Sequence, residues 1–391
     1  MRRATAKGIV FSFFSLAFMP INSAPAQAAA TVYESMTGSN GGNINSTGSS
    51  DSTGFTGNWS MVNAFKNPTM TGVAGVYSNT YNSSLKFPTN SIFTLPSSNT
   101  AASTAANLWN VYFSARQMNS GVNFDANGSY YLSFLEYSPA PGGNWGSTIV
   151  GLLNGLPTSQ SDSSKSSIQV GRSYGGAPTI QLISANQAAW NTTPYTALGT
   201  ANNPSDASGF SWFVITKFTT VASGNDTISV KFFPSTSTVP SSDTSITWDV
   251  SYSTAITGNY GYLSVQNEYN GVIDELRGDA TYAAVAGIAT APSITAPSVS
   301  GTPNKGITTP LTVTVGAAGY LRFYIDGKRI PACLNRPTTG SAPNFTATCS
   351  WKPPVKGTHR IYAAFTSTDS SYTNANSPVA NIQVSPRTNN R

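Results

Sequence analysis

The chain carries short runs of alternating apolar and polar residues, without the 3.6-residue apolar period of amphipathic helices. Alternation with a period of two places successive side chains on opposite faces of a β-strand. The segments between the runs are rich in Gly, Asn, Asp, Pro and Ser, which favour turns. Many short strands at this spacing predict a β-sandwich or jelly roll. The clearest runs are 129–138, 166–175, 211–218, 226–233, 243–252, 261–268 and 271–277.

The composition changes after Val285. The segment AGIATAPSITAPSVSGTPNKG is rich in Pro, Ala, Ser and Thr and carries one charge, which is typical of a linker. A second alternating series follows, and its size and strand spacing suit an immunoglobulin-like sandwich. We therefore predict a large all-β domain over 31–287, a linker over 288–306 and a smaller β-sandwich over 307–386.

The first 28 residues have the features of a secretory signal peptide. Arg2, Arg3 and Lys7 precede the apolar run GIVFSFFSLAFMPI, and Ala26-Gln27-Ala28 supplies a small-residue cleavage site. The apolar run is shorter than the ~20 residues of a membrane-spanning helix. We expect residues 1–28 to be removed and the rest to be secreted, with no insertion into a membrane.

Charge is divided unevenly along the chain. Residues 31–287 contain 8 Lys and Arg against 13 Asp and Glu, a net charge of −5, whereas 288–391 contain 10 against 2, a net of +8. A basic module outside the cell can contact anionic polysaccharide or a polyanionic wall, although a solvated basic face explains the charge as well. Nucleic acid is not an expected partner, because no compact Lys/Arg run interleaved with aromatic residues is present.

The only two cysteines, Cys333 and Cys349, lie in the basic module. An even pair in a secreted chain predicts a disulfide, whereas a metal site needs more ligands nearby. They are 16 positions apart, closer than the inter-sheet pair of an immunoglobulin domain, so we expect the bridge to tie neighbouring strands and their loop.

Five segments follow one another along the large domain: VYESM near the start, FTGNWS (55–60), GSYYLSFLEY (128–137), FVITKFTTVASGNDTISVKFFPS (213–235) and GVIDELRGDATYAAV (271–285). Together they resemble the laminin-G-like branch of the concanavalin A-like lectin/glucanase superfamily. The basic module, from GYLRFYIDGKRIPAC to the Gly-Thr-His-Arg-Ile run, is similar to bacterial immunoglobulin-like repeat domains. The first resemblance implies a jelly roll, and it includes both carbohydrate-binding and glycan-cleaving proteins.

The acidic residues do not form the motif that glycan cleavage in this superfamily uses. The resemblance implies a Glu-x-Asp-x-x-Glu run on one strand, and none of the four glutamates, Glu34, Glu136, Glu268 and Glu275, begins one. Asp274 and Glu275 are neighbours, and in a regular strand they point to opposite faces. A retaining mechanism needs two carboxyl groups about 5 Å apart. We expect no catalytic residues, with a non-standard acid pair as the alternative.

Two further features of the sequence bear on chemistry. Glu275 and Arg277 share a face of the predicted closing strand and are expected to pair. The single histidine, His359, lies in a predicted strand of the basic module, so the large domain lacks the histidine of a Ser-His-Asp triad.

Loop aromatic residues are the candidate ligand contacts. Trp145 lies in PAPGGNWGS, and both Trp190 and Tyr195 lie in ANQAAWNTTPY. Aromatic rings beside Asn can stack on a sugar ring and hydrogen-bond its hydroxyls. The alternative is that these rings anchor their own loops.

A calcium site is the candidate metal centre. Asp125 and Asn127 in FDANGS lie at alternate positions and offer oxygen ligands, and Asp274 is a further candidate. A turn stabilised by side-chain hydrogen bonds to the backbone explains FDANGS equally well.

These observations predict a secreted, all-β, non-catalytic protein that binds extracellular polysaccharide or a cell-surface glycan, in binding or adhesion. The alternatives are an extracellular glycan-cleaving enzyme and a purely structural surface protein.

Overall fold

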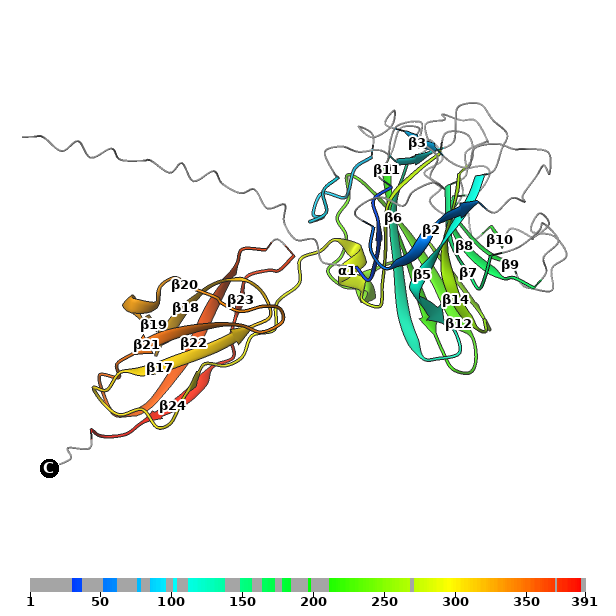
Figure 1. The fold of residues 1–391 in the computed structure, drawn as a ribbon. Coiled ribbons are helices and arrows are strands. Elements are labelled where there is room, and N and C mark those ends of the chain that lie inside the picture. The colour runs from blue at the N-terminus through cyan, green and yellow to red at the C-terminus, as the bar shows by residue number, and fades with distance from the viewer. Residues whose placement is uncertain are drawn as a thin grey trace, which may run out of the picture.

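The computed structural model places two groups of β-strands along the chain, joined after a short helix (Figure 1). The predicted signal peptide lies outside the described residues. No helix among the described residues is both long and apolar enough to cross a membrane. The residues described are 30–36, 52–61, 76–78, 85–95, 101–103, 112–137, 148–156, 164–172, 178–183, 196–197, 211–267, 271–369 and 371–387.

The described part of the first group forms two antiparallel sheets, which we call the eight-stranded and the seven-stranded sheet. In order, the eight-stranded sheet contains β13 (Val250–Thr254), β12 (Asp226–Pro234), β11 (Ser211–Thr220), β6 (Gly128–Tyr137), β15 (Val272–Asp279), β4 (Ala101–Ser103) and β3 (Val76–Ser78), and β1 (Val32–Glu34) also pairs with β15. The seven-stranded sheet contains β10 (Thr196–Ala197), β9 (Pro178–Ile183), β8 (Ser167–Arg172), β7 (Thr148–Leu153), β14 (Asn259–Asn267), β5 (Tyr112–Asn123) and β2 (Phe55–Met61).

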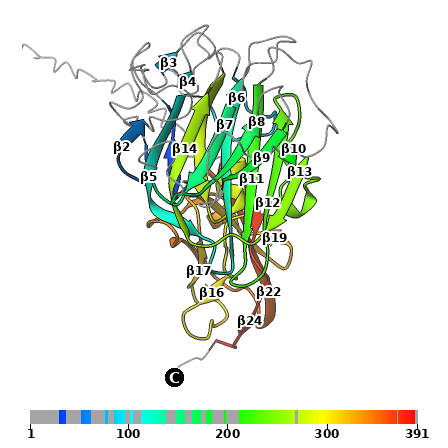
Figure 2. The ribbon, with the colours of Figure 1, turned by 90° about the vertical axis from the view of Figure 1, so that its right-hand side faces the viewer.

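The chain crosses repeatedly between these two sheets. It passes from β5 to β6 and from β14 to β15, and each step changes sheet, so strands distant in sequence become neighbours. β6, for example, lies between β11 and β15. Figure 2 shows the strands of the seven-stranded sheet side by side. The predicted all-β sandwich is confirmed.

The eight-stranded sheet is buried on both faces. Along β11, Trp212 and Val214 pack into the core between the sheets, whereas Phe213 and Ile215 pack into a second apolar cluster on the outer face. Residues of α1 (Tyr282–Ala286) complete that second cluster. Burial on both sides explains why this strand reads SWFVITKF, an almost continuous apolar run.

One predicted strand is shorter than expected. The run 243–252 begins with the 3-10 helix η2 (Asp243–Ser245), and strand structure starts only at Val250. The Ser242 side chain accepts a hydrogen bond from the Thr244 N–H at 3.3 Å and caps this turn. Local capping by a serine therefore overrides the alternating pattern there.

The second group of strands, which we call the rear module, is a smaller sandwich around its own apolar core. Its three-stranded sheet contains β16 (Ser298–Val299), β17 (Thr309–Val315) and β21 (Phe345–Trp351). Its six-stranded sheet contains β19 (Lys328–Arg329), β18 (Gly319–Ile325), β22 (Gly357–Ser367) and β23 (Ala375–Asn376), with β20 (Arg336–Pro337) on β18 and β24 (Ala380–Val384) on β22.

The segment 288–306, predicted as a linker, packs at both of its ends. Ile288 belongs to the outer cluster of the front sandwich. Thr290 donates its backbone N–H to the Ser371 carbonyl at 2.9 Å, and β16 pairs with β17 of the rear module. The segment is therefore held by contacts on both sides.

The hairpin between β18 and β19 turns at Asp326-Gly327, a dipeptide typical of tight hairpin turns. Asp326 and Gly327 both adopt positive φ, 48° and 78°. Two consecutive residues in the left-handed region are the signature of a type I′ turn, whose twist matches that of the flanking strands.

The disulfide joins Cys333 and Cys349, as predicted, with the Cα atoms 5.5 Å apart. Cys333 ends the 3-10 helix η3 (Pro331–Cys333), which follows β19, and Cys349 lies in β21 of the other sheet. The bridge therefore ties a loop to the next long strand and also links the two layers of the module.

Reduction of this disulfide should lower the free energy of unfolding by about 3 kcal/mol, because the closed loop restricts the unfolded chain. Urea unfolding followed by circular dichroism, with and without dithiothreitol, measures the difference. The variant Cys333→Ala/Cys349→Ala is the control, since its unfolding should not respond to the reductant. Equal curves for the parent protein in both buffers would contradict the expectation.

Candidate functional site

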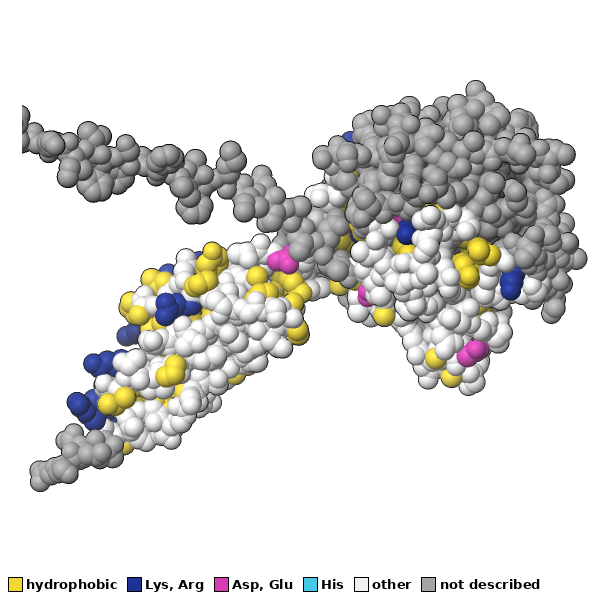
Figure 3. Space-filling view, in the orientation of Figure 1, with side chains coloured by type: hydrophobic (Ala, Val, Ile, Leu, Met, Phe, Trp, Pro, Cys, Tyr) yellow, Lys and Arg dark blue, Asp and Glu magenta, His cyan; other side chains and the backbone are white. Residues whose placement is uncertain are grey.

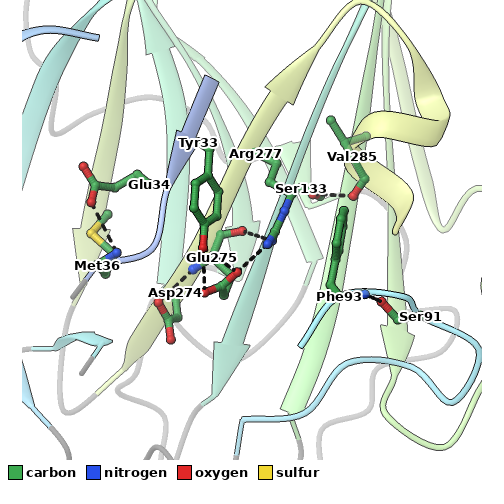
Figure 4. A network of polar contacts seen from close by, with 10 residues as sticks. All are labelled: Tyr33, Glu34, Met36, Ser91, Phe93, Ser133, Asp274, Glu275, Arg277 and Val285. Carbon is green, nitrogen blue, oxygen red and sulfur yellow. Dashed lines mark hydrogen bonds and ion pairs between the residues drawn. The ribbon is translucent and has the colours of Figure 1, made fainter. Parts of the chain in front are cut away.

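The acidic pair that the sequence singles out lies in a β-bulge of β15. Asp274 pairs with Leu135 and Arg277 with Ser133, so β15 contains one extra residue at this point. Glu275 adopts a positive φ of 54° within the bulge. The expected opposite orientation of Asp274 and Glu275 does not hold, because a bulge interrupts strict alternation. Figure 4 shows both carboxyl groups close together beside Tyr33.

Glu275 is held in a buried ion pair. Its Oε2 lies 2.5 Å from Nη2 of Arg277, and the Tyr33 hydroxyl lies 3.2 Å from both carboxylate oxygens. The Arg277 guanidinium packs over the Phe93 ring, 3.8 Å from its centroid (Figure 4). Glu275 is 0% and Arg277 1% exposed. The predicted pairing is confirmed, and the carboxylate oxygens of Glu275 are engaged by the Arg277 guanidinium and the Tyr33 hydroxyl.

A second buried ion pair crosses between the two sheets. Glu34 on β1 accepts a hydrogen bond from Nη1 of Arg116 on β5 at 2.6 Å. The same carboxylate oxygen accepts a hydrogen bond from the indole N–H of Trp59 at 3.1 Å. Arg116 also donates to the Gly57 carbonyl at 2.8 Å. These contacts fasten the edge of the eight-stranded sheet to β2 and β5 of the other sheet.

Glu136 is also buried, and its carboxylate accepts a hydrogen bond from the Thr148 hydroxyl. Glu268 lies outside the described residues. The three described glutamates are therefore all withdrawn from water, and each is bound by hydroxyl, indole or guanidinium donors.

Asp279, the last residue of β15, binds the segment that precedes β1 and the segment that follows β15. It accepts hydrogen bonds from the backbone N–H and hydroxyl of Thr31, and from the same two groups of Thr281. Burial by itself raises the pKa of this carboxyl, but the four donors outweigh burial and lower the pKa of Asp279 below its ordinary value.

The three candidate calcium ligands do not share one site. Asp125 accepts the Gly258 N–H at 3.0 Å and Asn127 the Ala222 N–H at 2.8 Å, both at the turn between β5 and β6. Asp274 instead pairs with Leu135, which lies seven residues beyond Gly128, the first residue of β6. Asp274 is therefore far along the strand from that turn. No group of three or more His, Cys, Asp or Glu side chains able to hold a metal occurs in the described part of the chain.

The outer face of the seven-stranded sheet carries a row of small and polar side chains. Cross-strand pairing aligns Ser264 of β14, Gly151 of β7 and Gln169 of β8, next to Ser167. A Cβ added to Gly151 would lie 2.8 Å from Ser264 Oγ and 3.1 Å from Gln169 Cγ, so these groups share one face. The alternate residues of these strands, such as Val150 and Leu152, point to the opposite face and fill the core between the two sheets.

Two polar atoms of this row have no hydrogen-bond partner. Ser167 Oγ and Gln169 Nε2 are two of the buried side-chain polar atoms that form no hydrogen bond among the described residues. Ser167 is 1% and Gln169 2% exposed, whereas Tyr262 and Gln266 beside them are half-buried. An unpaired buried polar group is costly, so this row is the unusual feature of the face.

The seven strands of this sheet contain no Asp, Glu or His. Acid–base chemistry therefore has no carboxylate or imidazole to use within the described strands of this face. The chemical character of the row is that of neutral hydroxyl and amide groups.

Sequence reasoning did not identify the Ser167–Gln169 row, because its members come from strands far apart in the chain. The aromatic residues that it did select, Trp145, Trp190 and Tyr195, lie outside the described residues.

Neither a protein-family model nor a curated protein matches the chain. Among solved structures, endo-beta-1,4-glucuronan lyase from the fungus Trichoderma reesei aligns with 66% of this chain and 98% of its own, at 11% identity and a TM-score of 0.30. The binding domain of botulinum neurotoxin DC in complex with SialylT covers 70% and 83%, at 10% identity and a TM-score of 0.24. These scores are too low to establish a shared fold, so function is argued from the residues of this chain.

Removing the guanidinium from the buried pair should destabilise the protein strongly. Arg277→Met leaves the Glu275 carboxylate buried without its cation, which should lower the free energy of unfolding by about 3–5 kcal/mol. Lys231→Met is the matched control, because the Lys231–Asp249 pair is 2.5 Å long but its side chains are 24% and 13% exposed. It should cost about 1 kcal/mol or less. Equal losses in urea unfolding would contradict the buried role.

The Asp279 carboxylate should make stability depend on pH on the acid side. Its pKa is lower in the folded than in the unfolded chain, so its contribution is complete above the unfolded value of about 3.9 and disappears as the pH falls below it. Asp279→Asn should therefore destabilise the protein at pH 7, and the difference from the parent should shrink between pH 4 and pH 2. Urea midpoints across this range test it, and a constant difference would refute it.

Proposed function

We propose that this chain is a secreted, non-catalytic glycan-binding protein, and that its front sandwich binds a neutral oligosaccharide on the outer face of the seven-stranded sheet. The observation that carries the proposal is the Ser167–Gln169 row, in which a hydroxyl and an amide nitrogen are buried without partners. Secretion is supported by the N-terminal sequence, where a basic start precedes a short apolar run.

A sugar ring carries the hydrogen-bond donors and acceptors that the Ser167 hydroxyl and the Gln169 amide lack. Each hydroxyl of a pyranose is both a donor and an acceptor, so it can satisfy the Gln169 amide and the Ser167 hydroxyl together. Leaving such groups unpaired costs about 1–3 kcal/mol each, and a ligand that pairs them recovers this cost on binding. Half-buried Tyr262 lies on the same face, opposite Leu153 in the strand pairing, and adds an aromatic ring with a polar tip.

The absence of acidic residues from the seven strands supports binding over cleavage. Glycoside hydrolysis requires two carboxyl groups beside the scissile bond. The described glutamates are instead buried in contacts that hold the sandwich together, most clearly Glu34 with Arg116 and Glu275 with Arg277. The neutral hydroxyl and amide groups of the row also favour a neutral sugar, because they hydrogen-bond hydroxyl groups without requiring a charge on the ligand.

The substitution Gln169→Leu separates binding from stability. It removes the unsatisfied amide while keeping a similar volume, so it should leave the free energy of unfolding unchanged or raise it by about 1 kcal/mol. Binding to neutral oligosaccharides should fall by about tenfold or more, because a polar contact to the ligand is lost. A glycan array probed with the full chain, followed by calorimetric titration of a neutral hit, measures the loss.

Thr216→Val is the matched control. Thr216 Oγ1 is another buried hydroxyl of the described residues that lacks a partner, and it belongs to β11 of the other sheet. Its removal should also be neutral or stabilising, but it should leave glycan binding unchanged. The proposal fails if no neutral glycan binds, if Gln169→Leu binds as well as the parent, or if the hit is cleaved and new reducing ends appear.

A further inference from the structure

The outer face of the six-stranded sheet in the rear module carries tyrosine and arginine side chains. Even-numbered residues of β18 and β22 point outward, because odd-numbered ones such as Phe323 and Ile361 fill the core. β19 adds one more outward position, since Arg329 pairs with Tyr324. We call this surface the Tyr–Arg platform, and its members are Tyr320, Arg322, Tyr324, Arg329, Arg360 and Tyr362.

The platform is ordered by contacts between its own side chains. Tyr324 lies directly opposite Tyr362, and their rings stack with centroids 4.7 Å apart and planes 4° from parallel. The Arg329 guanidinium lies 5.9 Å from the centre of the Tyr324 ring. Tyr320 is 42% exposed, which is high for a large aromatic side chain. Stacking fixes the two central rings, so a ligand does not have to order them.

Positive charge is in excess in this module, with 10 Lys and Arg against 2 Asp and Glu over 288–391. Asp326 lies at the edge of the platform, where it accepts the Arg360 backbone N–H at 2.9 Å and contacts His359 Nδ1 at 2.7 Å, and Asp369 accepts the Ser371 N–H at 2.8 Å. Within its described residues, the module has no ion pair between a Lys or Arg side chain and a carboxylate. Figure 3 shows Lys and Arg side chains gathered along one edge of the module.

We propose that the Tyr–Arg platform binds an acidic polysaccharide, one that carries carboxylate or sulfate groups on its sugar rings. Guanidinium groups bind such oxyanions through two parallel hydrogen bonds, and they are more weakly hydrated than ammonium groups. The tyrosine hydroxyls hydrogen-bond the neutral sugar hydroxyls between the charges. The regular spacing of anionic groups along a polysaccharide suits cations arranged on a flat sheet.

The ring geometry favours a polysaccharide over single-stranded nucleic acid. Bases bind by stacking on open aromatic faces. Tyr324 and Tyr362 stack on each other, and side chains stand roughly perpendicular to a sheet, so these two rings present hydroxyl edges to a ligand. The platform also differs from the row on the front sandwich, which is uncharged, so the two surfaces select different classes of glycan.

The test measures binding of the full chain to polygalacturonate, with dextran as the neutral polymer and a dT20 oligonucleotide as the nucleic acid. Arg322→Gln/Arg329→Gln should weaken polygalacturonate binding by about tenfold or more, because two charge-assisted contacts are lost. Lys352→Gln/Lys356→Gln removes the same charge from the exposed segment between β21 and β22, and it should weaken binding by about twofold or less. Tyr320→Ala, at an exposed position, should weaken it severalfold.

Three results would overturn the proposal. The first is no binding of polygalacturonate at low salt. The second is an equal loss in the arginine and lysine pairs, which would assign binding to net charge. The third is binding of dT20 as tight as that of polygalacturonate, which would assign the platform to nucleic acid. Circular dichroism of each variant confirms its folding, and the Gln169→Leu variant should bind polygalacturonate as the parent does, which keeps this test separate from that of the front sandwich.

Discussion

The front sandwich depends on a three-residue strand that supplies one member of a buried ion pair and a hydrogen bond to a second buried pair. In β1, Tyr33 reaches outward to Glu275 and Arg277, and the next residue, Glu34, reaches inward to Arg116 of the opposite sheet. Buried ion pairs add little net stability compared with apolar residues of the same volume, but removal of one partner is costly. Their effect here is to favour one arrangement, because the observed register of β1 on β15 brings Tyr33 to Glu275 and Glu34 to Arg116 together.

Because the described glutamates are buried, the outer face of the seven-stranded sheet and the surface of the rear module differ in chemical character. The described glutamates are committed to the scaffold, so the surfaces that remain for ligands differ in a simple way. The seven-stranded sheet offers neutral hydroxyl and amide groups, whereas the rear module offers tyrosine and unneutralised arginine. A front of net −5 and a tail of net +8 therefore accompany two chemically different surfaces on one chain.

Alternation was sufficient to predict most of the strands, and the single pair of cysteines was sufficient to predict the disulfide, because these features are local or depend on only two residues. The bulge at Glu275 was not predictable, since no glycine marks the positive φ and the residue is held there by contacts with Tyr33 and Arg277. The Ser167–Gln169 row was missed for a related reason. In SSIQVGR these residues look like ordinary solvent-facing positions, whereas in the structure Ser167 is 1% and Gln169 2% exposed, beside Gly151 of β7.

The pairing of β1 with β15 also determines how the front sandwich responds to tension. Val32 lies opposite Gly278, so the chain enters and leaves the sandwich at the same end of this antiparallel pair. Force along the chain therefore separates the two strands one hydrogen-bonded pair at a time and does not shear the whole ladder at once. The contacts between Thr31 and Asp279 bear that force first. A sandwich closed in this way opens from its ends under load, before the sheets behind β1 are pulled apart.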